Sequence, residues 1–426
     1  MVLSRRTFLS ASLLAGGVAI VPAPASYAAP RARLTLPAPT GRFPVGTVDL
    51  HLVDHDRANP WAPAPARREL MVSLWYPAAG VARFPRAPHM RPGAAAHFGS
   101  ASGAGSTLYG VPAGAVDFAA TRTSGHVGAP VARHRRPFPV VLYSAGAGDP
   151  RTWGTAAVQD LASRGYVVVT VDHTYDASEV QFPDGRVVTG VLNQLFQEAQ
   201  QPDDFQRLAS LIFDTRVADT RFVLDQLVAV NCGSHPGARG LTGALDLSRT
   251  GMVGVSAGGL TALRVMDEDP RVKVAVDMGG SIESPIVPDV LQLWPVARHG
   301  LARPFMLVGD PGTDHHRTPS WRMLWENSTG WRVDLHLTGA SGEDSYKDAV
   351  PLVPQIARQL GLPASYVSKI IGSIDPVRAT DTQRRLVAAF FDKWLRGRGG
   401  HELDGPSPRF PDVTFVGVGA ASPHPR

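Results

Sequence analysis

Residues 250–260 read TGMVGVSAGGL, and the GVSAG at 254–258 fits the pattern GxSxG. This pattern is typical of a sharp turn between a strand and a helix, where a strained central residue needs small residues two positions before and after it. The residues before the turn are mostly apolar, as in a buried strand, and residues 260–266 carry apolar side chains at helical spacing. The order strand, turn, helix makes Ser256 a candidate nucleophile.

Strand-like and helical patterns alternate on both sides of this turn. The alternation predicts an α/β protein whose central sheet is mostly parallel, with helices on both faces and Ser256 near the middle of the sheet. A hairpin-like turn is expected at 184–185. Further strands are expected at 46–53, 70–75, 138–144, 167–171, 272–276, 304–308 and 331–337, and helices at 152–164, 203–230, 320–329 and 381–395.

The composition is that of an ordinary globular protein. The chain has 426 residues, of which 44% are hydrophobic and 19% charged, enough for one large domain or two small ones. The formal charge is +5, and no run of Lys or Arg indicates a nucleic-acid partner. The single cysteine, Cys232, excludes an intramolecular disulfide, and no HExxH, CxxC or EF-hand pattern indicates a metal, so we expect no cofactor. The sequence does not indicate an oligomeric state.

Residues 1–28 are expected to be a twin-arginine signal peptide. Arg5 and Arg6 precede an apolar run at 13–21, and small residues surround Ala28. The apolar run is too short to span a membrane, and prolines follow it directly. We therefore expect export, cleavage near Ala28, and a secreted protein with no stable membrane span.

The remaining chain is expected to hold one large domain at 46–398. A Pro-rich linker or irregular entry precedes it at 29–45, and an irregular C-terminal tail follows it at 399–426. Within the domain, residues 83–136 are rich in Gly, Ala, His and Arg and show little periodicity. This segment is expected to be an irregular loop region or a small cap over one end of the sheet.

Several long stretches, spread over about 48–398, carry a resemblance to a known family. They are VVLYSAGAGDPRTWGT at 140–155, DLASRGYVVVTVDHTYDA at 160–177, DPRVKVAVDMGG at 269–280, PSWRMLW at 319–325, IGSIDPVRA at 371–379 and FFDKWLRGR at 390–398. In these stretches the chain resembles actinobacterial α/β-hydrolases that are similar to lipases and to platelet-activating factor acetylhydrolases. The resemblance implies the α/β-hydrolase fold, and hydrolysis of a small-molecule or lipid ester through an acyl-enzyme.

The resemblance also assigns two parts of the site. It implies that Ser256 is the nucleophile and that the backbone N–H groups of Ala257 and Ala147 form the oxyanion hole. Relatives usually have a larger residue at Ala147 and a histidine at Val255. Because the hole uses backbone donors, the alanine changes only the shape of the acyl pocket.

The catalytic acid of the relatives lies in an NLDG-like turn after the next strand. Aligning DPRVKVAVDMGG at 269–280 puts Gly279 at that position. Asp277 lies two residues earlier, and because side chains alternate along a strand, both residues would project to the same side. Asp277 is therefore a candidate substitute acid, or else a polar residue that ends a strand.

The catalytic histidine of the relatives lies in a pattern like GxxHxSF(T)D after the last strand. The corresponding segment here, GASGEDSYKD at 339–348, places Glu343 at the position of the base. His336 is nearby, but its phase in the strand predicts that it faces solvent. His316, beside His315 in the loop after the strand at 304–308, is a candidate relocated base. His173 is expected to line the site or to shape its loop.

Two functional hypotheses follow. The first is an exported serine esterase of acetylhydrolase or lipase type, with weak activity and with His316, or Glu343 with a raised pKa, as the base. A glutamate has an ordinary pKa of about 4.3 and accepts protons poorly at neutral pH, unless burial raises that pKa by roughly two units. The second is a non-catalytic relative that keeps the fold and the pocket but binds a ligand or partner.

Overall fold

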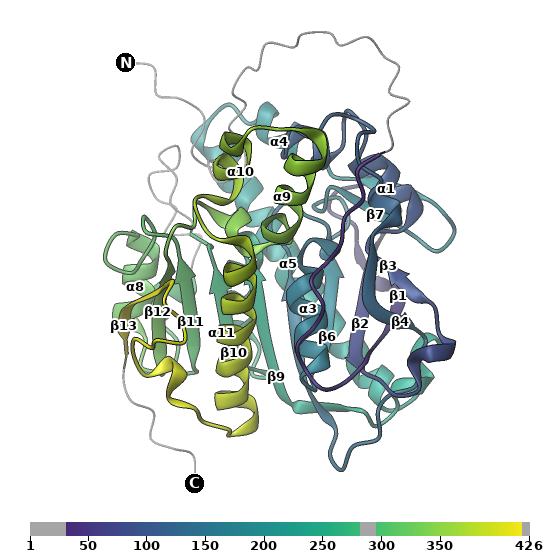
Figure 1. Cartoon of the computed structure of the whole chain (residues 1–426). Helices are drawn as coiled ribbons and strands as arrows, with labels where there is room; N and C mark the ends of the chain where they lie inside the picture. The colour runs from purple at the N-terminus through teal and green to yellow at the C-terminus, as the bar shows by residue number, and fades with distance from the viewer. Residues whose placement is uncertain (1–30, 282–294, 420–426) are drawn as a thin grey trace.

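The computed structural model describes residues 31–281 and 295–419, so the expected signal peptide and its cleavage site lie outside the described residues. Within these two ranges, eleven strands form one sheet in the order β13-β12-β11-β10-β9-β5-β6-β2-β1-β4-β3 (Figure 1). The six neighbouring strands from β6 to β12 are parallel. The sheet strands are β1 (Val45–Ala58), β2 (Arg67–Pro77), β3 (Arg86–Pro88), β4 (Arg122–Val127), β5 (Phe138–Ser144), β6 (Val167–Asp172), β9 (Leu245–Val255), β10 (Val272–Met278), β11 (Phe305–Gly309), β12 (Arg332–Leu337) and β13 (Val413–Val418).

Helices cover both faces of this sheet. Along β5, Val141 and Tyr143 pack in the same apolar cluster as α3, α9 and α11, whereas Val140 and Leu142 pack with α5 to α8. A strand covered on both faces reads as a continuous apolar run, which is why the sequence of β5 does not alternate. The predicted α/β-hydrolase fold, with its mostly parallel sheet, is confirmed. The helices are α1 (Pro92–Phe98), α2 (Ala104–Thr107), α3 (Thr155–Ser163), α4 (Leu192–Glu198), α5 (Pro202–Asn231), α6 (Ala257–Glu268), α7 (Pro295–His299), α8 (Pro319–Asn327), α9 (Ala349–Leu360), α10 (Ala364–Ile371) and α11 (Pro376–Arg396).

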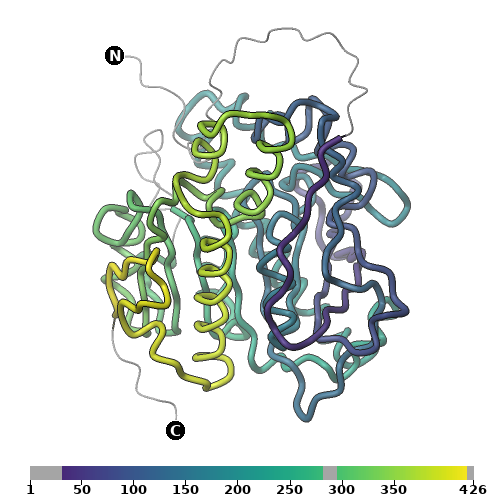
Figure 2. Tube along the Cα trace, viewed as in Figure 1, coloured from purple at the N-terminus to yellow at the C-terminus, as the bar shows by residue number. Residues whose placement is uncertain are grey.

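The segment at 31–44, expected to be a linker or irregular entry, lies against the helices of one face (Figure 2). Leu34 and Leu36 are buried in the main apolar cluster. The backbone N–H of Thr35 donates to Gln355 of α9, and that of Gly41 donates to Ser163 of α3. These contacts make the segment part of the folded domain.

Residues 83–136, expected to be irregular or a small cap, contain regular elements. They supply β3, β4 and the short helices α1 and α2. β4 pairs in parallel with β1 and so extends the sheet. Phe98, Tyr109 and Phe118 of this segment are buried together, which gives it a core that its low periodicity does not reveal.

The C-terminal segment at 399–426 is expected to be an irregular tail, but one strand in its described part, 399–419, differs from that expectation. Residues Val413–Val418 form β13, which pairs antiparallel with β12 at the edge of the sheet. Its sequence, VTFVGV, is short and contains a glycine, so it carries a weak strand signal. β13 pairs with the backbone N–H and C=O groups that β12 would otherwise expose at the edge of the sheet, and this pairing fixes its position. A separate two-stranded sheet, the hairpin of β7 (Glu179–Gln181) and β8 (Val187–Thr189), contains the turn expected at 184–185.

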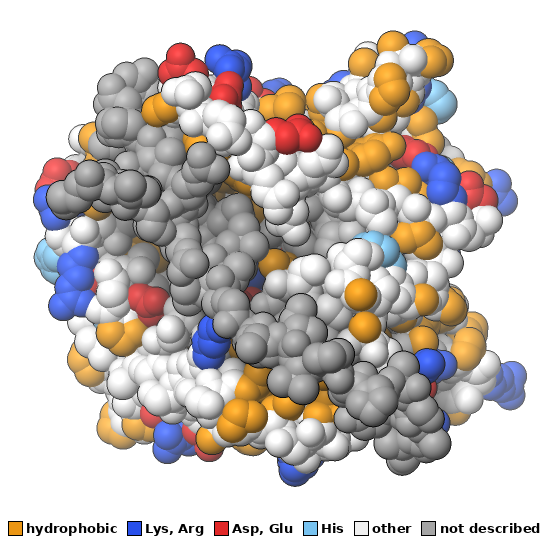
Figure 3. All heavy atoms as spheres, turned by 90° about the horizontal axis from the view of Figure 1, so that it is seen from above, with side chains coloured by type: hydrophobic (Ala, Val, Ile, Leu, Met, Phe, Trp, Pro, Cys, Tyr) orange, Lys and Arg blue, Asp and Glu red, His pale blue; other side chains and the backbone are white. Residues whose placement is uncertain are grey.

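One face of the described surface is mixed in charge. Figure 3 views the face at the carboxyl ends of the parallel strands, where Lys and Arg side chains are interspersed with Asp and Glu. Among the helices of 31–281 and 295–419, none is both long and apolar enough to cross a membrane.

Candidate active site

The turn between β9 and α6 holds Ser256 in a strained conformation. Its φ is 53° and its ψ is −126°, and among described non-glycine residues only Tyr175 shares a positive φ. A Cβ on Gly254 would lie 2.1 Å from the carbonyl carbon of Gly258, and a Cβ on Gly258 would lie 2.0 Å from the carbonyl oxygen of Ser144. Both glycines are therefore required by close backbone contacts, as the GxSxG pattern demands.

The Ser256 side chain is partly exposed, and its hydroxyl forms no hydrogen bond with any described residue. Its backbone N–H donates to the carbonyl of Met278 at 2.9 Å, which fixes the turn to the end of β10. The next residue, Ala257, begins α6, and the first N–H groups of a helix have no partner within the helix. Those N–H groups, together with the positive end of the helix dipole, favour negative charge beside the hydroxyl.

Arg216 of α5 fixes the loop after β5, residues 145–148, by hydrogen bonds to its backbone. Arg216 donates Nη1 to the carbonyl of Ala145 at 2.7 Å and Nη2 to the carbonyl of Gly146 at 3.0 Å. Its Nε also donates to the Asp176 carboxylate at 2.7 Å, and the N–H of Gly148 contacts the same carboxylate at 3.4 Å. The buried Arg216–Asp176 pair thus holds the loop on both sides of Ala147.

A second buried network lies beside this clamp. His173 places Nδ1 2.9 Å from Asp219 and Nε2 3.3 Å from the hydroxyl of Ser144. Arg68 donates to both oxygens of Asp219, at 3.0 and 2.6 Å, and these charges hold the Asp219 pKa below its usual value despite burial. Ser144 is only 1% exposed, so this Ser-His-Asp arrangement is closed to substrate. His173 therefore supports the base of the loop.

Asp277 lies beneath the first turn of α6. It is fully buried, and its Oδ1 accepts a hydrogen bond from the N–H of Gly280 at 3.0 Å. Burial raises the Asp277 pKa well above its usual value. A Cβ on Gly259 would lie 1.9 Å from Oδ1, which shows how closely the helix covers the carboxylate. Among described residues, no histidine bonds to Asp277.

Gly279 and Glu343, at the positions where relatives have the acid and the base, are neighbours. Gly279 has a φ of 67°, and a Cβ built there would lie 3.3 Å from the Cα of Glu343. Glu343 begins the 3₁₀ helix Glu343–Tyr346 and is 4% exposed. The structure thus brings these two positions together, although neither residue is of the type found in the relatives.

Glu343 belongs to an acidic cluster around Lys347. The Lys347 ammonium lies 2.7 Å from Asp149, 3.0 Å from Glu343 and 3.2 Å from Asp344. Burial raises the pKa of Asp149 to about 6 and also raises that of Asp344. Burial alone would lower the Lys347 pKa, but the carboxylates, Asp149 foremost, raise it well above its usual value. Lys347 is therefore a cation and not a proton acceptor.

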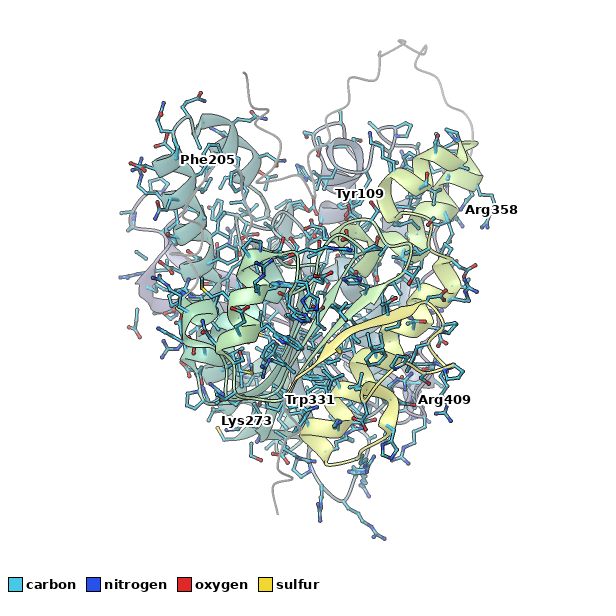
Figure 4. All side chains as sticks on the ribbon, turned by 90° about the vertical axis from the view of Figure 1, so that its left-hand side faces the viewer. Tyr109, Phe205, Lys273, Trp331, Arg358 and Arg409 are labelled. Carbon is cyan, nitrogen blue, oxygen red and sulfur yellow. The ribbon has the colours of Figure 1, made fainter. Side chains whose placement is uncertain are left out.

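This cluster touches the loop that carries Ala147. A Cβ on Gly146 would lie 2.5 Å from Asp149 and 3.5 Å from the Lys347 ammonium. The Tyr109 hydroxyl donates to Asp344 at 3.0 Å and so ties the cluster to the segment before β4. In Figure 4, Tyr109 lies at the upper end of the molecule, opposite Lys273 at the start of β10.

The histidines at 315, 316 and 336 form a separate group. His316 is exposed and its ring lies 3.9 Å from that of His315, which is buried and bonds Asp334 at 2.6 Å. His336 was expected to face solvent but is only 9% exposed, because Asp314, 3.2 Å from its Nε2, belongs to a loop that covers it. Within the described residues, none of these three rings forms a hydrogen bond with Ser256.

A cavity of about 420 Å³ adjoins the Ala147 loop. Ala147 and Gly148 form part of its wall. The other lining residues include the apolar Leu192 and Phe196 and the polar His97. Its lining includes Ala147, one of the two expected oxyanion-hole residues, but neither Ala257 nor Ser256. Across the described ranges, no three His, Cys, Asp or Glu side chains form a group able to hold a metal ion.

Sequence reasoning missed the residues that support the site: Arg68, Asp149, Asp176, Arg216, Asp219 and Lys347. One signal was available for two of them. Arg216 and Asp219 lie three residues apart on the apolar face of α5, and both are buried there. Charged residues within an apolar stripe indicate a buried ion pair. Their partners come from distant segments, and nothing in the local sequence identifies them.

Comparison with known proteins identifies the family of this chain. Residues 29–281 match the family model of platelet-activating factor acetylhydrolase, isoform II. A probable 1-alkyl-2-acetylglycerophosphocholine esterase of Arthroderma benhamiae is 26% identical over 285 residues, which are 65% of this chain and 66% of that protein. A structure of a ferulic acid esterase from Streptomyces cinnamoneus is 35% identical, with a TM-score of 0.70, and covers 90% of this chain and 99% of its own.

Proposed function

We propose that this chain, which belongs to the platelet-activating factor acetylhydrolase isoform II family of esterases, is itself an exported serine esterase of low turnover. The observation that carries the proposal is the conformation of Ser256. A strained serine with an unbonded hydroxyl, placed before the N-terminus of α6, has the exposure and the electrostatic surroundings that a nucleophile needs.

The proposed reaction follows from the groups around that hydroxyl. The Ser256 Oγ attacks the ester carbonyl, and the oxygen that becomes negative accepts hydrogen bonds from the N–H groups of Ala257 and Ala147. The serine proton passes to a base, the alcohol leaves with a proton, and water then hydrolyses the acyl-enzyme. Arg216 donates hydrogen bonds to the carbonyls of Ala145 and Gly146, just before Ala147. These bonds hold the loop in place before the substrate binds.

The base is the weak part of this site. Glu343 is the better candidate, because it adjoins Gly279 at the positions implied by the relatives, whereas His316 is exposed within another cluster. The Glu343 carboxylate also lies 3.0 Å from the buried Lys347 ammonium, and a proton transferred to Glu343 would abolish that ion pair. Loss of a triad histidine costs on the order of 10⁶ in turnover and leaves roughly 10³–10⁴ over water. We therefore propose a slow enzyme.

The proposed substrates are small-molecule or lipid esters. The relatives are named for an acetylglycerophosphocholine esterase and a ferulic acid esterase. The 420 Å³ cavity, which Ala147 lines but Ser256 does not, supports a substrate whose apolar part extends past Ala147 towards Leu192 and Phe196. Parallel rates on p-nitrophenyl acetate and methyl ferulate would test this preference.

A second candidate function is ligand binding without turnover. It is favoured by one observation, the absence of a histidine bonded to Ser256 among the described residues. Under this hypothesis the cavity beside Ala147 is the binding site, and Ser256 is not acylated.

Labelling with a fluorophosphonate probe distinguishes the two. We expect stoichiometric, slow labelling of the mature protein, lost in Ser256→Ala and kept in Ser144→Ala, which removes the buried serine beside His173. Loss of labelling in Ser144→Ala would instead identify Ser144 as the nucleophile and contradict the proposal. A folded protein that no probe labels between mildly acidic and alkaline pH would refute the esterase and leave the binding protein.

We also propose that residues 1–28 direct twin-arginine export. Replacing Arg5 and Arg6 by lysine should retain the protein in the cytoplasm, whereas the exported protein should begin near Ala29. Export that is unaffected by the substitution would contradict the proposal.

A further inference from the structure

We infer that an arginine-rich surface, at the end of the molecule opposite Ser256, binds a flexible linear polymer of phosphate groups. We call this surface the arginine face, and its residues are Arg42, Arg133, Arg135, Arg136, Arg396 and Arg398. They come from the segments that precede β1 and β5 and from the end of α11, and these segments lie at the lower end of Figure 1. Ser256 instead follows the carboxyl end of β9, so the inference does not depend on the proposed esterase.

Packing around Phe43 brings these three segments together. The Phe43 ring centroid lies 5.9 Å from that of Phe138 and 6.5 Å from that of His134, so the segment before β1 contacts the segment before β5. A Cβ on Gly165 would lie 3.3 Å from the Phe43 ring and 2.9 Å from the guanidinium of Arg396. The end of α11 therefore lies close to Phe43 as well, and the six arginines share one surface.

Most of the positive charge of the arginine face lacks a counter-charge. Among the residues that the structure describes, Arg396 is the one member that forms an ion pair, with Asp392 at 2.9 Å. The other five arginines are exposed. The formal charge of the whole chain is only +5, so the face carries an excess of positive charge comparable with that of the entire protein. Such a concentration of one sign of charge raises the local concentration of anions.

Three of these arginines lie within one short turn that is held by a histidine. The ring of His134 packs against that of Phe138, with 5.1 Å between the centroids, and its Nδ1 lies 2.9 Å from the carbonyl oxygen of Arg136. Arg133, Arg135 and Arg136 are exposed on either side of this histidine. Because consecutive Cα atoms are about 3.8 Å apart, the three arginine Cα atoms lie within about 11 Å of one another. A ligand that matches them must carry several anionic groups at a similarly short spacing.

The type of side chain favours phosphate as the anionic group. A guanidinium group is planar and donates two parallel N–H bonds to two oxygens of one phosphate, whereas an ammonium group acts as a point charge. A single exposed pair of this kind contributes little, because water and salt screen it. Phosphates joined in one chain bind together, since the first contact raises the effective concentration of the others. A polymer therefore gains from this face what a free phosphate does not.

A flexible polymer fits the arginine face better than a bilayer or a rigid duplex does. Proteins bound to a bilayer surface commonly insert apolar side chains in addition to attracting its charges. The large hydrophobic residues that the described surface exposes all lie outside the arginine face: Val127, Leu211, Val228, Val377 and Val418. The arginines also come from three segments, of which the one before β5 projects below the others in Figure 1, so a chain must bend to contact all of them.

Titration of the protein with long-chain inorganic polyphosphate, followed by calorimetry at several salt concentrations, tests this inference. We expect binding at about 50 mM salt that weakens steeply towards about 200 mM, because each phosphate contact releases counterions. Duplex DNA, poly-L-glutamate and phosphatidylglycerol vesicles are compared at the same concentration of charge and should bind more weakly. Ser256→Ala should bind polyphosphate as the wild type does, so the result is separate from that of the fluorophosphonate labelling.

The combined replacement Arg133→Gln, Arg135→Gln and Arg136→Gln should raise the Kd for polyphosphate about tenfold or more. The slope of log K against log salt concentration should become shallower by about two, at about 0.7 for each lost contact with a single-stranded polyanion. Arg42→Gln with Arg398→Gln should have a smaller effect in the same direction, and this double variant serves if the triple variant does not fold.

The combined replacement Arg67→Gln, Arg322→Gln and Arg358→Gln is the matched control. It removes the same charge from exposed arginines outside the arginine face, and Figure 4 shows Arg358 at the upper end of the molecule. The Kd of this control should stay close to the wild-type value, because salt screens distant charges. Equal losses in the control and in the arginine-face variants would overturn the inference, as would the absence of binding to polyphosphate at about 50 mM salt. Tighter binding of the vesicles, of poly-L-glutamate or of duplex DNA than of polyphosphate would overturn it as well.

Discussion

Restoring the acid and the base of the relatives should increase the esterase activity of this chain. The change is Gly279→Asp combined with Glu343→His, at two positions that the structure makes neighbours. The new histidine would accept the proton of Ser256, and the new aspartate would orient the imidazole and stabilise its protonated form. Neither substitution alone completes this chain of hydrogen bonds, so we expect the two effects to be strongly non-additive.

The size of the expected gain follows from the surroundings. General acid–base catalysis contributes about 10²–10⁴-fold, and we expect the lower end, near 10²-fold. An aspartate Cβ at 279 would lie 3.1 Å from the Tyr346 ring and 3.3 Å from the Cα of Glu343, so the neighbours must move slightly. The positive φ of Gly279 adds a cost of about 1–2 kcal/mol. Lys347 keeps Asp149 and Asp344 as partners after Glu343 is replaced, so its charge remains neutralised.

The assay is kcat/KM on p-nitrophenyl acetate, with circular dichroism and thermal melting to establish that each variant is folded. Gly279→Asp with Glu343→Gln is the matched control, since it introduces the acid but no base, and it should show no gain. Ser256→Ala in the double variant should return the rate to background. A folded double variant whose kcat/KM equals that of the wild type would refute the interpretation of Gly279 and Glu343 as the degenerate acid and base.

Three further predictions concern the groups that support the site. Arg216→Lys keeps the charge but loses the forked geometry that holds the Ala147 loop, so fluorophosphonate labelling should slow about tenfold to a hundredfold; unchanged labelling would contradict this role. The pKa of Asp149 is raised from 3.8 to about 6 on folding, so the folded state binds the proton more tightly and the free energy of unfolding should fall as the pH rises from 4 to 6, by up to about 3 kcal/mol. Urea unfolding at both pH values should show this fall in the wild type relative to Asp149→Asn, and parallel curves would refute it. Gly254→Ala should lower the melting temperature strongly because its Cβ meets backbone at 2.1 Å, whereas Gly240→Ala, where a Cβ meets nothing within 4 Å, should not.

Most of the central sheet could be predicted because its signals are local. The apolar runs that became β5, β6, β10 and β11 are buried on both faces, and such runs are unambiguous when helical patterns separate them. β13 and β4 could not be predicted in this way. Each is a short strand that pairs with a partner already set by other parts of the chain, so tertiary pairing decides its conformation more than its own sequence does.

The site, too, has features that local sequence predicts and features that depend on distant contacts. The elbow at Ser256 follows from a pattern within five residues, and the adjacency of Gly279 and Glu343 follows from aligning two segments with relatives. The charges around Lys347 and Arg216 depend on contacts between segments far apart in the sequence, such as Asp149 with Lys347. The spacing of apolar residues cannot predict such an ion pair, because each of its members is a single polar residue within its own segment.

The strain at Ser256 bears on whether the chain is an enzyme or a binding protein. A non-glycine residue in this region of φ and ψ costs on the order of 1–3 kcal/mol, and a glycine there would remove most of that cost. The Ser256 hydroxyl does not stabilise the fold through a hydrogen bond, since it bonds to none of the described residues. The buried hydroxyl of Ser144, in contrast, lies 3.3 Å from His173 Nε2. A protein that only bound ligands would gain stability from Ser256→Gly and lose no hydrogen bond of the side chain to a described residue. The strained serine without a hydrogen bond at the N-terminus of α6 therefore favours the proposed esterase over the proposed binding protein.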